Sequence, residues 1–307
     1  MITKTNRYPI TQCALYKCKS KKKLAFFLNS SIPELREIQR TPEYHTFTID
    51  KQNSTDKREI SAPSAPLKKV QKRILKLLQR IERPDWLISG EKGKCYIDNG
   101  KAHQSSNHVL TMDIKKFYNN CHRESIYLFF KDVLQTSPDV ATILTDITSY
   151  ENMVPTGCPT SQLIAYYAYK DMFENLNMLA QNYGCKFTVY VDDLTFSSSN
   201  YFAYKALQRD VDICLRQFGH KPKLCKVKYY SPLVAKPITG TSVSAEHNLS
   251  VPNKLRFKII KNLQLIKIEL NPAQREKQRT SLLGQLQSAR NIEATIFPEI
   301  LRTVRSM

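Results

Sequence analysis

The chain has 307 residues, with 47 Lys or Arg against 27 Asp or Glu, and a formal net charge of +20. This length suffices for one large domain or for several subdomains with an ample core. The excess of positive charge predicts a polyanionic partner, by default nucleic acid. No apolar run of about 18 residues and no secretory signal occurs, so we expect a cytoplasmic protein with no membrane partner.

The eight cysteines are scattered, with no Cys-x-x-Cys pair and no paired histidines. This pattern fits neither a zinc site nor a disulfide framework, and it predicts reduced thiols that are mostly small core residues. The chain also has no Walker-type loop and no dinucleotide fingerprint.

The first segment, 1–33, contains no acidic residue and is rich in lysine. Two interpretations are open: a solvated basic arm, or a segment that follows phosphates. The crowded lysines are Lys17, Lys19, Lys21, Lys22 and Lys23.

Residues 43–60 have the pattern of a strand, a polar turn and a second strand. Lys51 and Arg58 would flank this hairpin, within reach of a triphosphate if the hairpin folds over a site. Pro66 then introduces an amphipathic helix whose polar face carries like charges with no interleaved acid. Such charges repel unless phosphates neutralise them, which favours nucleic-acid contact over a merely solvated face. The candidates are Lys68, Lys69, Lys72, Arg73 and Lys76.

A strand is predicted over 109–113, followed by a helix over 115–133. The strand ends on Asp113, where α/β folds tend to place chemistry. Asp113 could equally cap the following helix. Just ahead, 99–103 (Asn-Gly-Lys-Ala-His) is expected to be a loop.

Residues 154–161 (VPTGCPTS) form a predicted loop that opens a helix over 162–182. Its small residues, with Gly157, would let the backbone approach a ligand closely. A plain loop with a hydroxyl cap for the helix is the alternative.

Residues 186–198 (KFTVYVDDLTFSS) alternate as two strands around a tight turn, with Asp192 and Asp193 at its tip. Adjacent carboxylates repel, and each pKa would be raised unless a cation lies there. Mg²⁺ is the simplest such cation, because it prefers carboxylate and phosphate oxygens. Asp113 becomes a stronger ligand candidate beside this pair, since two-metal sites take carboxylates from separate strands.

Downstream we expect a helix over about 202–218, short strands near 227–230 and 238–243, and helices from about 253 onward. The last segment combines an apolar stripe with Lys254, Lys258 and Lys261.

Together these segments resemble a reverse transcriptase of the bacterial retron type, over nearly the whole chain. KREISAPSAPLKKVQKRIL (57–75) is similar to the fingers block of that family, and TMDIKKFYN (111–119) to its first catalytic motif. VPTGCPTSQ (154–162) is similar to the loop usually written LPQGAPTSP, although Thr156 replaces Gln. YVDD (190–193) matches the second catalytic motif.

Two elements point to the retron subtype. Asn99 and His103 resemble the Asn-Ala-x-x-His element ahead of the first motif, with Gly100 in place of Ala. Ile238–Gly240 resembles the Val-Thr-Gly element downstream of the catalytic hairpin.

The resemblance implies an α+β right-hand polymerase, in which an antiparallel palm sheet is backed by helices and the thumb is helical. The expected parts are a basic N-terminal segment 1–33, fingers 34–108, a first palm strand 109–118, a fingers/palm connection 119–165, palm 166–244 and thumb 245–307.

The resemblance also implies roles for individual residues. Asp113, Asp192 and Asp193 would hold two Mg²⁺ ions, and Lys226 would donate a proton to the leaving pyrophosphate. Tyr118, with Phe117 as the fallback, would exclude a 2′-hydroxyl. The implied dNTP contacts are Lys51, Arg58, Phe117, Tyr118, Thr156 and Gly157. The implied nucleic-acid contacts, besides the basic helix at 68–76, are Asn99, His103, Tyr190, Thr239, Gly240, Lys254, Arg256, Lys258 and Lys261.

The implied function is synthesis of multicopy single-stranded DNA from a cognate structured non-coding RNA, primed from a guanosine 2′-hydroxyl of that RNA. The implied context is phage defence beside a separate effector protein. Another bacterial reverse transcriptase, of group II intron or diversity-generating type, is one alternative. An RNA-binding protein with a lapsed polymerase site is another, which the three intact aspartates disfavour.

Overall fold

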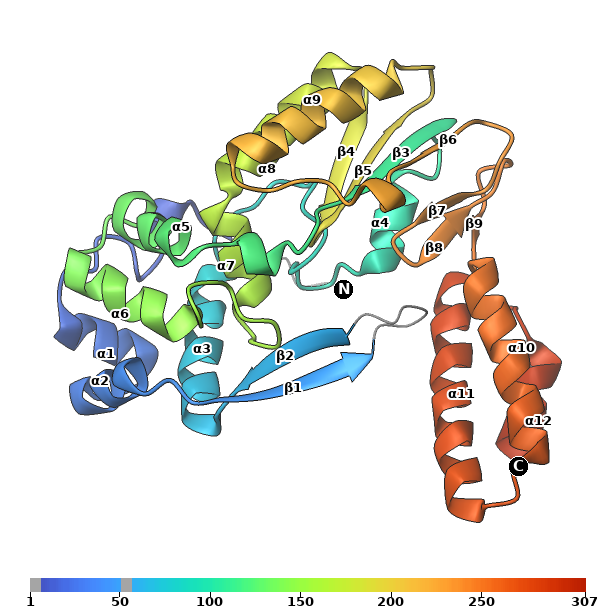
Figure 1. Cartoon of the computed structure of the whole chain (residues 1–307), viewed down its shortest axis with the longest axis horizontal. Coiled ribbons are helices and arrows are strands. Elements are labelled where there is room, and N and C mark those ends of the chain that lie inside the picture. Colours follow the sequence, from blue (N-terminus) through green and yellow to red (C-terminus); the bar gives the residue numbers. More distant parts are fainter. Residues whose placement is uncertain (1–6, 51–56) are drawn as a thin grey trace.

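The computed structural model describes residues 7–50 and 57–307. Lys51 therefore lies outside the described residues, and of Arg58 only the backbone position in β2 is known. Helices and a long hairpin form one side of the molecule, a sheet with its helices forms the middle, and three helices form a separate projection (Figure 1). We name these parts fingers, palm and thumb.

The fingers combine packed helices with the antiparallel hairpin β1–β2, in which Tyr44 pairs with Pro63 and Asp50 with Lys57. Ser61 N–H donates to Thr156 O, so the hairpin is attached to the loop ahead of α7. The elements are η1 (Ile10–Gln12), α1 (Lys21–Leu28), α2 (Ile32–Arg40), β1 (Tyr44–Asp50), β2 (Lys57–Pro63), α3 (Ala65–Leu78), α5 (Arg123–Leu128) and α6 (Pro138–Thr148).

The interpretation of 1–33 as a solvated arm is wrong for its described part. Leu15 and Leu24 are completely buried in the main core, because α1 packs between α2, α3 and α6. The lysines project from this packed unit, and Lys21 pairs with Asp139 at 3.3 Å.

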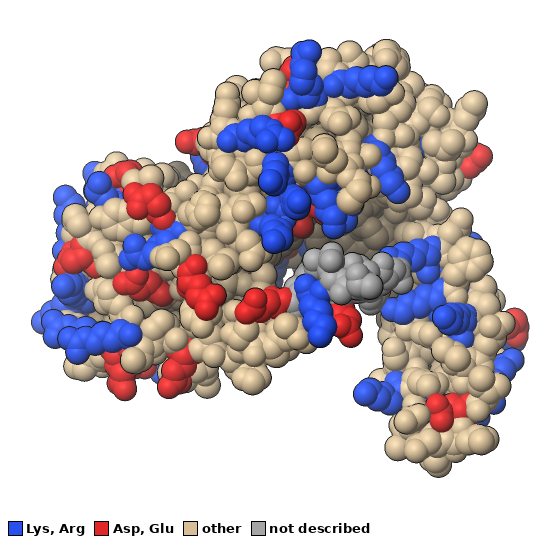
Figure 2. Space-filling view, in the orientation of Figure 1, with Lys and Arg blue, Asp and Glu red and all other residues tan. Residues whose placement is uncertain are grey.

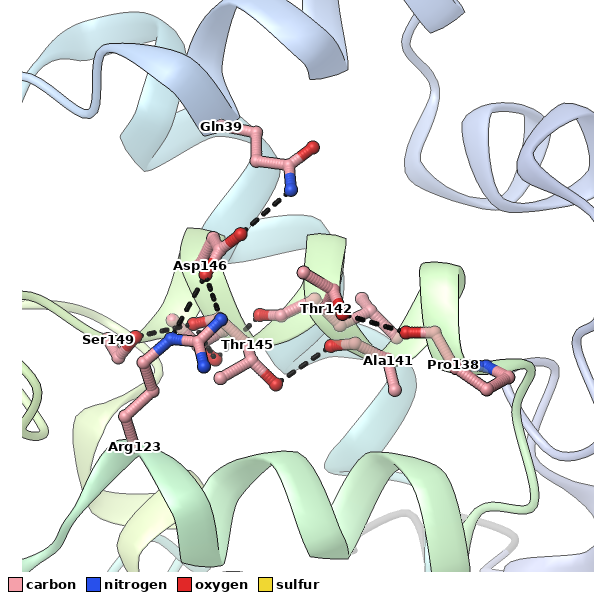
Figure 3. A network of polar contacts seen from close by, with 10 residues as sticks. Gln39, Arg123, Pro138, Ala141, Thr142, Thr145, Asp146 and Ser149 are labelled. Carbon is pink, nitrogen blue, oxygen red and sulfur yellow. Dashed lines mark hydrogen bonds and ion pairs between the residues drawn. The ribbon is translucent and has the colours of Figure 1, made fainter.

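Asp146 on α6 ties three fingers helices together (Figure 3). Its carboxylate accepts from Gln39 of α2 at 2.7 Å and from Arg123 of α5 at 2.5 Å. The shared carboxylate fixes α2 and α5 to α6.

The palm is an antiparallel sheet with strand order β4-β5-β3-β6, and α8 and α9 cover one face (Figure 1). A smaller sheet, β7-β8-β9, packs beside it through Val109 and Ile238. The palm strands are β3 (His108–Asp113), β4 (Lys186–Tyr190), β5 (Asp193–Ser198), β6 (Lys228–Tyr230), β7 (Lys236–Ile238), β8 (Thr241–Val243) and β9 (Leu249–Ser250). The helices are α4 (Tyr96–Ala102), α7 (Ser161–Ala168), α8 (Lys170–Asn182) and α9 (Tyr204–Gln217), with short turns η2 (Tyr118–Asn120), η3 (Phe129–Val133) and η4 (Leu224–Lys226).

Alternation along β5 separates two faces of the sheet. Leu194 and Phe196 are completely buried in the main apolar core. Asp193, Thr195 and Ser197 point to the opposite face, which is polar although Thr195 and Ser197 are each only 1% exposed. A buried polar face needs polar partners, and these come from α4.

The thumb has an apolar core of its own, formed by residues such as Ile259, Ile266 and Leu286. Its helices are α10 (Asn253–Ile268), α11 (Pro272–Ile292) and α12 (Pro298–Ser306). A polar link to the palm joins Tyr96 of α4 to Ser288 of α11, with 3.0 Å between their hydroxyl oxygens.

Three predicted elements differ from the structure. Residues 99–103 are not a loop: they complete α4 and its C-cap at His103. The helix expected over 115–133 is broken into η2, α5 and η3, since Lys116 adopts a left-handed backbone with φ of 51° and Cys121 and His122 are extended. The helix expected over 162–182 is two helices that meet at Tyr169. No helix among the described residues has both the length and the apolar character needed to cross a bilayer.

Glycine at position 100 is required by the contact between α4 and β8. A Cβ added to Gly100 would overlap Thr241 Oγ1 and come within 2.9 Å of Leu249 Cδ1. The missing side chain lets α4 lie close to the small sheet.

A buried ion pair fixes the segment that leads into α4. Arg83 and Glu91 contact each other with side chains that are each 1% exposed, and Glu91 also pairs with Arg7. Removing one partner of a buried pair leaves the other charge uncompensated.

We expect Glu91→Gln to lower the free energy of unfolding by about 3–5 kcal/mol, because the Arg83 charge then stays buried without a counterion. Denaturant unfolding followed by fluorescence of Trp86, the single tryptophan, measures this. The matched control is Glu276→Gln, whose carboxylate is 62% exposed, with an expected change below about 0.5 kcal/mol. Equal effects of the two variants would show that the pair has no structural role.

Candidate active site

The hairpin β4–β5 carries the two adjacent aspartates at its tip, as the alternation predicts. Val191 turns the chain with a left-handed φ of 61°, an unfavourable conformation for a β-branched residue. Its N–H donates to Ser89 Oγ at 2.9 Å, and Val189 is hydrogen-bonded to Trp86 O and to Ile88 N. The segment that contains Ser89 therefore supports the strained turn.

Asp113 meets this tip. It is the Cα partner of Asp193 in the antiparallel pair β3–β5, and the next residue, Ile114, donates its N–H to Asp192 O at 2.9 Å. Strand register thus brings Asp113 to the adjacent pair Asp192 and Asp193, which are distant from it in sequence. Asp113 is only 6% exposed.

Lys226 contacts the Asp113 carboxylate from the η4 turn. The preceding Lys223 donates its backbone N–H to Asp113 O at 2.7 Å, which fixes η4 against the end of β3. Burial acts to lower the pKa of Lys226, but the hydrogen bond and charge of Asp113, with Asp193 and Asp192, outweigh it and raise that pKa. Lys226 therefore stays protonated and supplies positive charge to the carboxylates.

Asp193 carries the clearest electrostatic signature. Its pKa is raised to about 7, first by burial and then by the charges of Asp192 and Asp113, while Lys226 and a hydrogen bond from Thr239 lower it. A carboxyl group whose pKa is raised by burial and by neighbouring carboxylates favours a bound cation.

Asp113, Asp193 and Lys226 line a cavity of about 140 Å³ together with Thr111, Thr195, Pro237 and Thr239. Carboxylate oxygens suit a hard divalent cation, and such a cation would lower the raised pKa of Asp193. In the described part of the chain no three His, Cys, Asp or Glu side chains already stand as a metal cluster. The residues fit a divalent cation by donor type and charge, with Lys226 as the cation now in contact with Asp113.

The expected dNTP contacts differ in how far their side chains are exposed. Tyr118 is half-buried, whereas Phe117 is 4% exposed and packs on Phe173 and His220 in the core. The fallback role of Phe117 as a sugar contact is therefore wrong. Thr156 donates its hydroxyl to Glu59 O at 2.6 Å, and a Cβ on Gly157 would lie 2.9 Å from Ile60 Cγ2. This loop is thus closely packed against the β2 strand.

Asn99 and His103 are not on a nucleic-acid surface. Both are completely buried and hydrogen-bonded to the palm strands and to Thr239, so their predicted direct contact with nucleic acid is wrong. Thr239 and Gly240 form the β7–β8 turn, with φ of 38° and 80°. Tyr190 is half-buried and pairs with Asp193 across β4–β5.

Some of the basic candidates form hydrogen bonds within the protein, whereas others are exposed. Arg73 donates to Phe27 O at 2.7 Å, and Arg256 donates to Val251 O at 2.9 Å and to Glu293 at 2.7 Å. Both arginines are half-exposed and hydrogen-bonded within the protein, and their contact with nucleic acid stays a prediction. The exposed candidates are Lys68, Lys69, Lys72, Lys76, Lys254 and Lys261, while Lys258 is half-exposed. Figure 2 shows Lys and Arg side chains on the palm above the central hollow and on the thumb.

Ser89, Lys223 and Tyr96 position the site and were not singled out in the sequence. Ser89 and Lys223 act through single hydrogen bonds to the turn and to Asp113 O, which no periodicity or motif signals. Tyr96 lies only three residues before Asn99, so a helical rather than loop interpretation of 99–103 could have found it.

A family model described as reverse transcriptase (RNA-dependent DNA polymerase) matches residues 49–284. The chain belongs to this family. The match contains Asp113, Asp192 and Asp193 and the sheet that unites them. Polymerase domains of this family use divalent metal ions, in agreement with the donor set at the carboxylates.

Curated relatives confirm the resemblance to the retron type. The Salmonella heidelberg retron Se72 reverse transcriptase is 30% identical over 50% of this chain and 41% of its own length. The Escherichia coli retron Ec86 and Ec48 reverse transcriptases are 26% and 28% identical, over 55% and 58% of this chain and 54% and 48% of theirs. The chain thus matches about half the length of these relatives.

Solved structures agree on the fold alone. Telomerase from Candida albicans, in complex with a TWJ fragment of telomeric RNA, has a TM-score of 0.51 at 10% identity over 87% of this chain and 60% of that one. Apo telomerase from Candida tropicalis has a TM-score of 0.50 at 10% identity over 68% and 55%. The predicted α+β right-hand polymerase fold is confirmed.

The raised pKa of Asp193 predicts an effect on stability in metal-free protein. The pKa is about 7 in the folded chain and about 3.9 in an unfolded one, so the stabilising contribution of the protonated group is lost as pH rises through 7. Asp193→Asn cannot ionise, and we expect it to raise the free energy of unfolding by about 2–4 kcal/mol at pH 8 and by less than half of that at pH 5.

Denaturant unfolding in the presence of a chelator measures this difference. Asp132→Asn, at a carboxylate that is 57% exposed, is the matched control with no expected gain. Excess divalent cation should then stabilise the wild type more than Asp193→Asn. Equal gains at both pH values would contradict the burial and repulsion described for Asp193.

Proposed function

We propose that this chain is a retron reverse transcriptase, an RNA-directed DNA polymerase that copies a cognate structured non-coding RNA into multicopy single-stranded DNA. Synthesis starts from a guanosine 2′-hydroxyl of that RNA and gives a branched RNA–DNA product. The protein works in the cytoplasm, in phage defence beside a separate effector protein. The observation that carries the polymerase proposal is the register that pairs Asp113 with Asp193 beside Asp192.

In the proposed site Asp113, Asp192 and Asp193 hold two Mg²⁺ ions. When bound, these ions lower the pKa of the primer hydroxyl and neutralise charge on the reacting phosphates. The register of β3 and β5 presents carboxylates from both strands to one place, so the reacting groups are oriented before chemistry.

Other side chains bind and discriminate. Lys226 is kept protonated beside Asp113 and is the proposed proton donor to the leaving pyrophosphate. Tyr118, half-buried next to the buried Phe117, is the proposed barrier to a ribose 2′-hydroxyl. Arg58 and Lys51 are proposed to bind the triphosphate through charge-assisted hydrogen bonds.

RNA binding is proposed to use two basic surfaces. The lysines of α3 lie on its exposed side, opposite Leu67, Val70 and Ile74, which are buried. α10 exposes Lys254 and Lys261 on the thumb. Lysines at such positions bind phosphates without reading sequence, so they suit a structured RNA recognised by its shape.

Asp192→Asn is expected to abolish DNA synthesis, by at least about a thousandfold in kcat, because a metal ligand is lost at the reacting centre. RNA affinity should stay within about twofold, since the net charge changes by only one unit. Expression together with the upstream intergenic DNA, followed by isolation of small single-stranded DNA, measures the product. Asp132→Asn is the matched control.

Two outcomes would contradict the proposal. Active Asp192→Asn would exclude the metal role of the hairpin. Wild-type DNA without a branch to RNA would favour another bacterial reverse transcriptase over the retron type.

Replacement of Lys68, Lys69 and Lys72 by Gln is expected to weaken binding to RNA of any base sequence. It should also reduce the slope of log affinity against log salt by about 2–3, because about one counterion is released per phosphate contact. Filter binding or fluorescence anisotropy over a salt series measures the slope. The control replaces the exposed Lys170, Lys186 and Lys205, away from the cavity at Asp113, and an equal change in slope there would contradict a specific α3 surface.

A further inference from the structure

The imidazole of His103 bonds two buried hydroxyls on the polar face of the palm sheet. Thr188 on β4 is 2% exposed and Ser197 on β5 is 1% exposed, so their hydroxyls need partners inside the protein. His103 Nε2 lies 2.6 Å from Thr188 Oγ1, and its Nδ1 lies 2.6 Å from Ser197 Oγ. The ring therefore joins the two strands of the catalytic hairpin from the side of α4.

Donor and acceptor chemistry gives these hydrogen bonds a direction. Ser106 donates to Ser197 at 2.9 Å, and Thr188 donates to Asn99 Oδ1 at 2.5 Å. Because a hydroxyl has a single hydrogen to donate, Thr188 must accept from His103, and the ring proton is on Nε2. Burial lowers the pKa of His103 to about 3, so the ring is neutral and Nδ1 accepts from Ser197.

Asn99 extends the same series of hydrogen bonds toward the catalytic carboxylates. Its Nδ2 donates to Thr239 Oγ1 at 2.9 Å. The Thr239 hydroxyl then has its own hydrogen left for Asp193, which lines the same cavity and whose pKa is lowered by Thr239. Each donor thus points the same way, from Ser106 through the imidazole to Asp193.

The helix α4, which carries Asn99 and ends at His103, also contacts the thumb. Tyr96 begins α4 three residues before Asn99, and its hydroxyl lies 3.0 Å from Ser288 Oγ on α11. Its ring lies over the turn that contains Thr239, because a Cβ on Gly240 would be 3.2 Å from Tyr96 Cδ2. In Figure 1, α4 lies between the palm strands and the small sheet that leads to the thumb.

We propose that α4 couples the seating of the thumb to the position of Asp193, with Asn99, His103, Thr188 and Thr239 as positioning residues. This inference rests on the proposed polymerase function, since it concerns a carboxylate which that reaction uses. Displacing the thumb from α4 would move Tyr96, and through the rigid helix it would move Asn99 and the Thr239 hydroxyl. The carboxylates are then aligned when the thumb is seated on α4.

Thr188→Val tests the chain at a residue that touches neither the carboxylates nor the cavity. We expect kcat for primer extension to fall about 10–100-fold with KM for dNTP nearly unchanged, because positioning is lost without loss of a substrate contact. Thr188→Ser keeps the hydroxyl and should restore most of kcat. The matched control is Thr148→Val, which removes a buried hydroxyl that donates only to Leu144 O and Thr145 O of its own helix.

A double-mutant cycle tests the link to the thumb. Tyr96→Phe removes only the hydroxyl that meets Ser288. Combined with Thr188→Val it should lower kcat by much less than the product of the single effects, because both changes interrupt one chain. Independent, multiplicative effects would overturn the coupling. If Thr188→Val does not fold, Asn99→Asp takes its place in the cycle, since it keeps the shape and replaces the amide donor to Thr239.

Hydrogen exchange gives a readout that needs no catalysis. Peptides covering 186–198 should exchange at least about threefold faster in Tyr96→Phe and Thr188→Val than in Thr148→Val, while β1 of the fingers stays unchanged. Unchanged exchange and kcat in both variants would overturn the inference. An inactive wild type with the expected exchange pattern would instead overturn the proposed function and leave the coupling supported.

Discussion

The repulsion between Asp113 and Asp193 is the constraint around which the palm is built. Strand register makes them Cα partners, and burial together with the charges of Asp192 and Asp113 raises the pKa of Asp193 to about 7. Lys226 and Thr239 offset part of this cost within the site. Apolar burial on the opposite face of the sheet offsets the remaining cost, since Leu194 and Phe196 are buried there in the main core. The sheet can hold an unfavourable charge cluster because its other side is strongly apolar.

The thumb has an apolar core separate from that of the fingers and palm, so it can move while they stay rigid. The fingers and palm share one continuous apolar cluster, whereas the thumb closes around a cluster of its own. Polar contacts such as that of Tyr96 with Ser288 then connect the thumb to the palm. Polar contacts of this kind can break and re-form at lower cost than packed apolar surface, so the thumb can reposition without opening the palm.

Much of the fold and the three aspartates could be predicted because they depend on local patterns. Period-two alternation around Asp192 and Asp193 identified the hairpin, and the end of a predicted strand identified Asp113. Partners that depend on burial could not be predicted. Asn99 and His103 have polar side chains like any surface residue, and only the packed structure shows them to be completely enclosed. The predicted sugar contact of Phe117 is wrong for the same reason, since an aromatic side chain after a strand can point either into the core or toward solvent.

The close contact at Gly100 limits how segments could be exchanged between this chain and its relatives. The related element has alanine at this position, and its methyl group would occupy the space of Thr241 Oγ1. A chimera that received α4 from a relative would therefore need a matching replacement on β8, since small and large residues across a tight interface are compatible only as a pair. Positions 100 and 241 would therefore have to be exchanged together, although 140 residues of chain separate them.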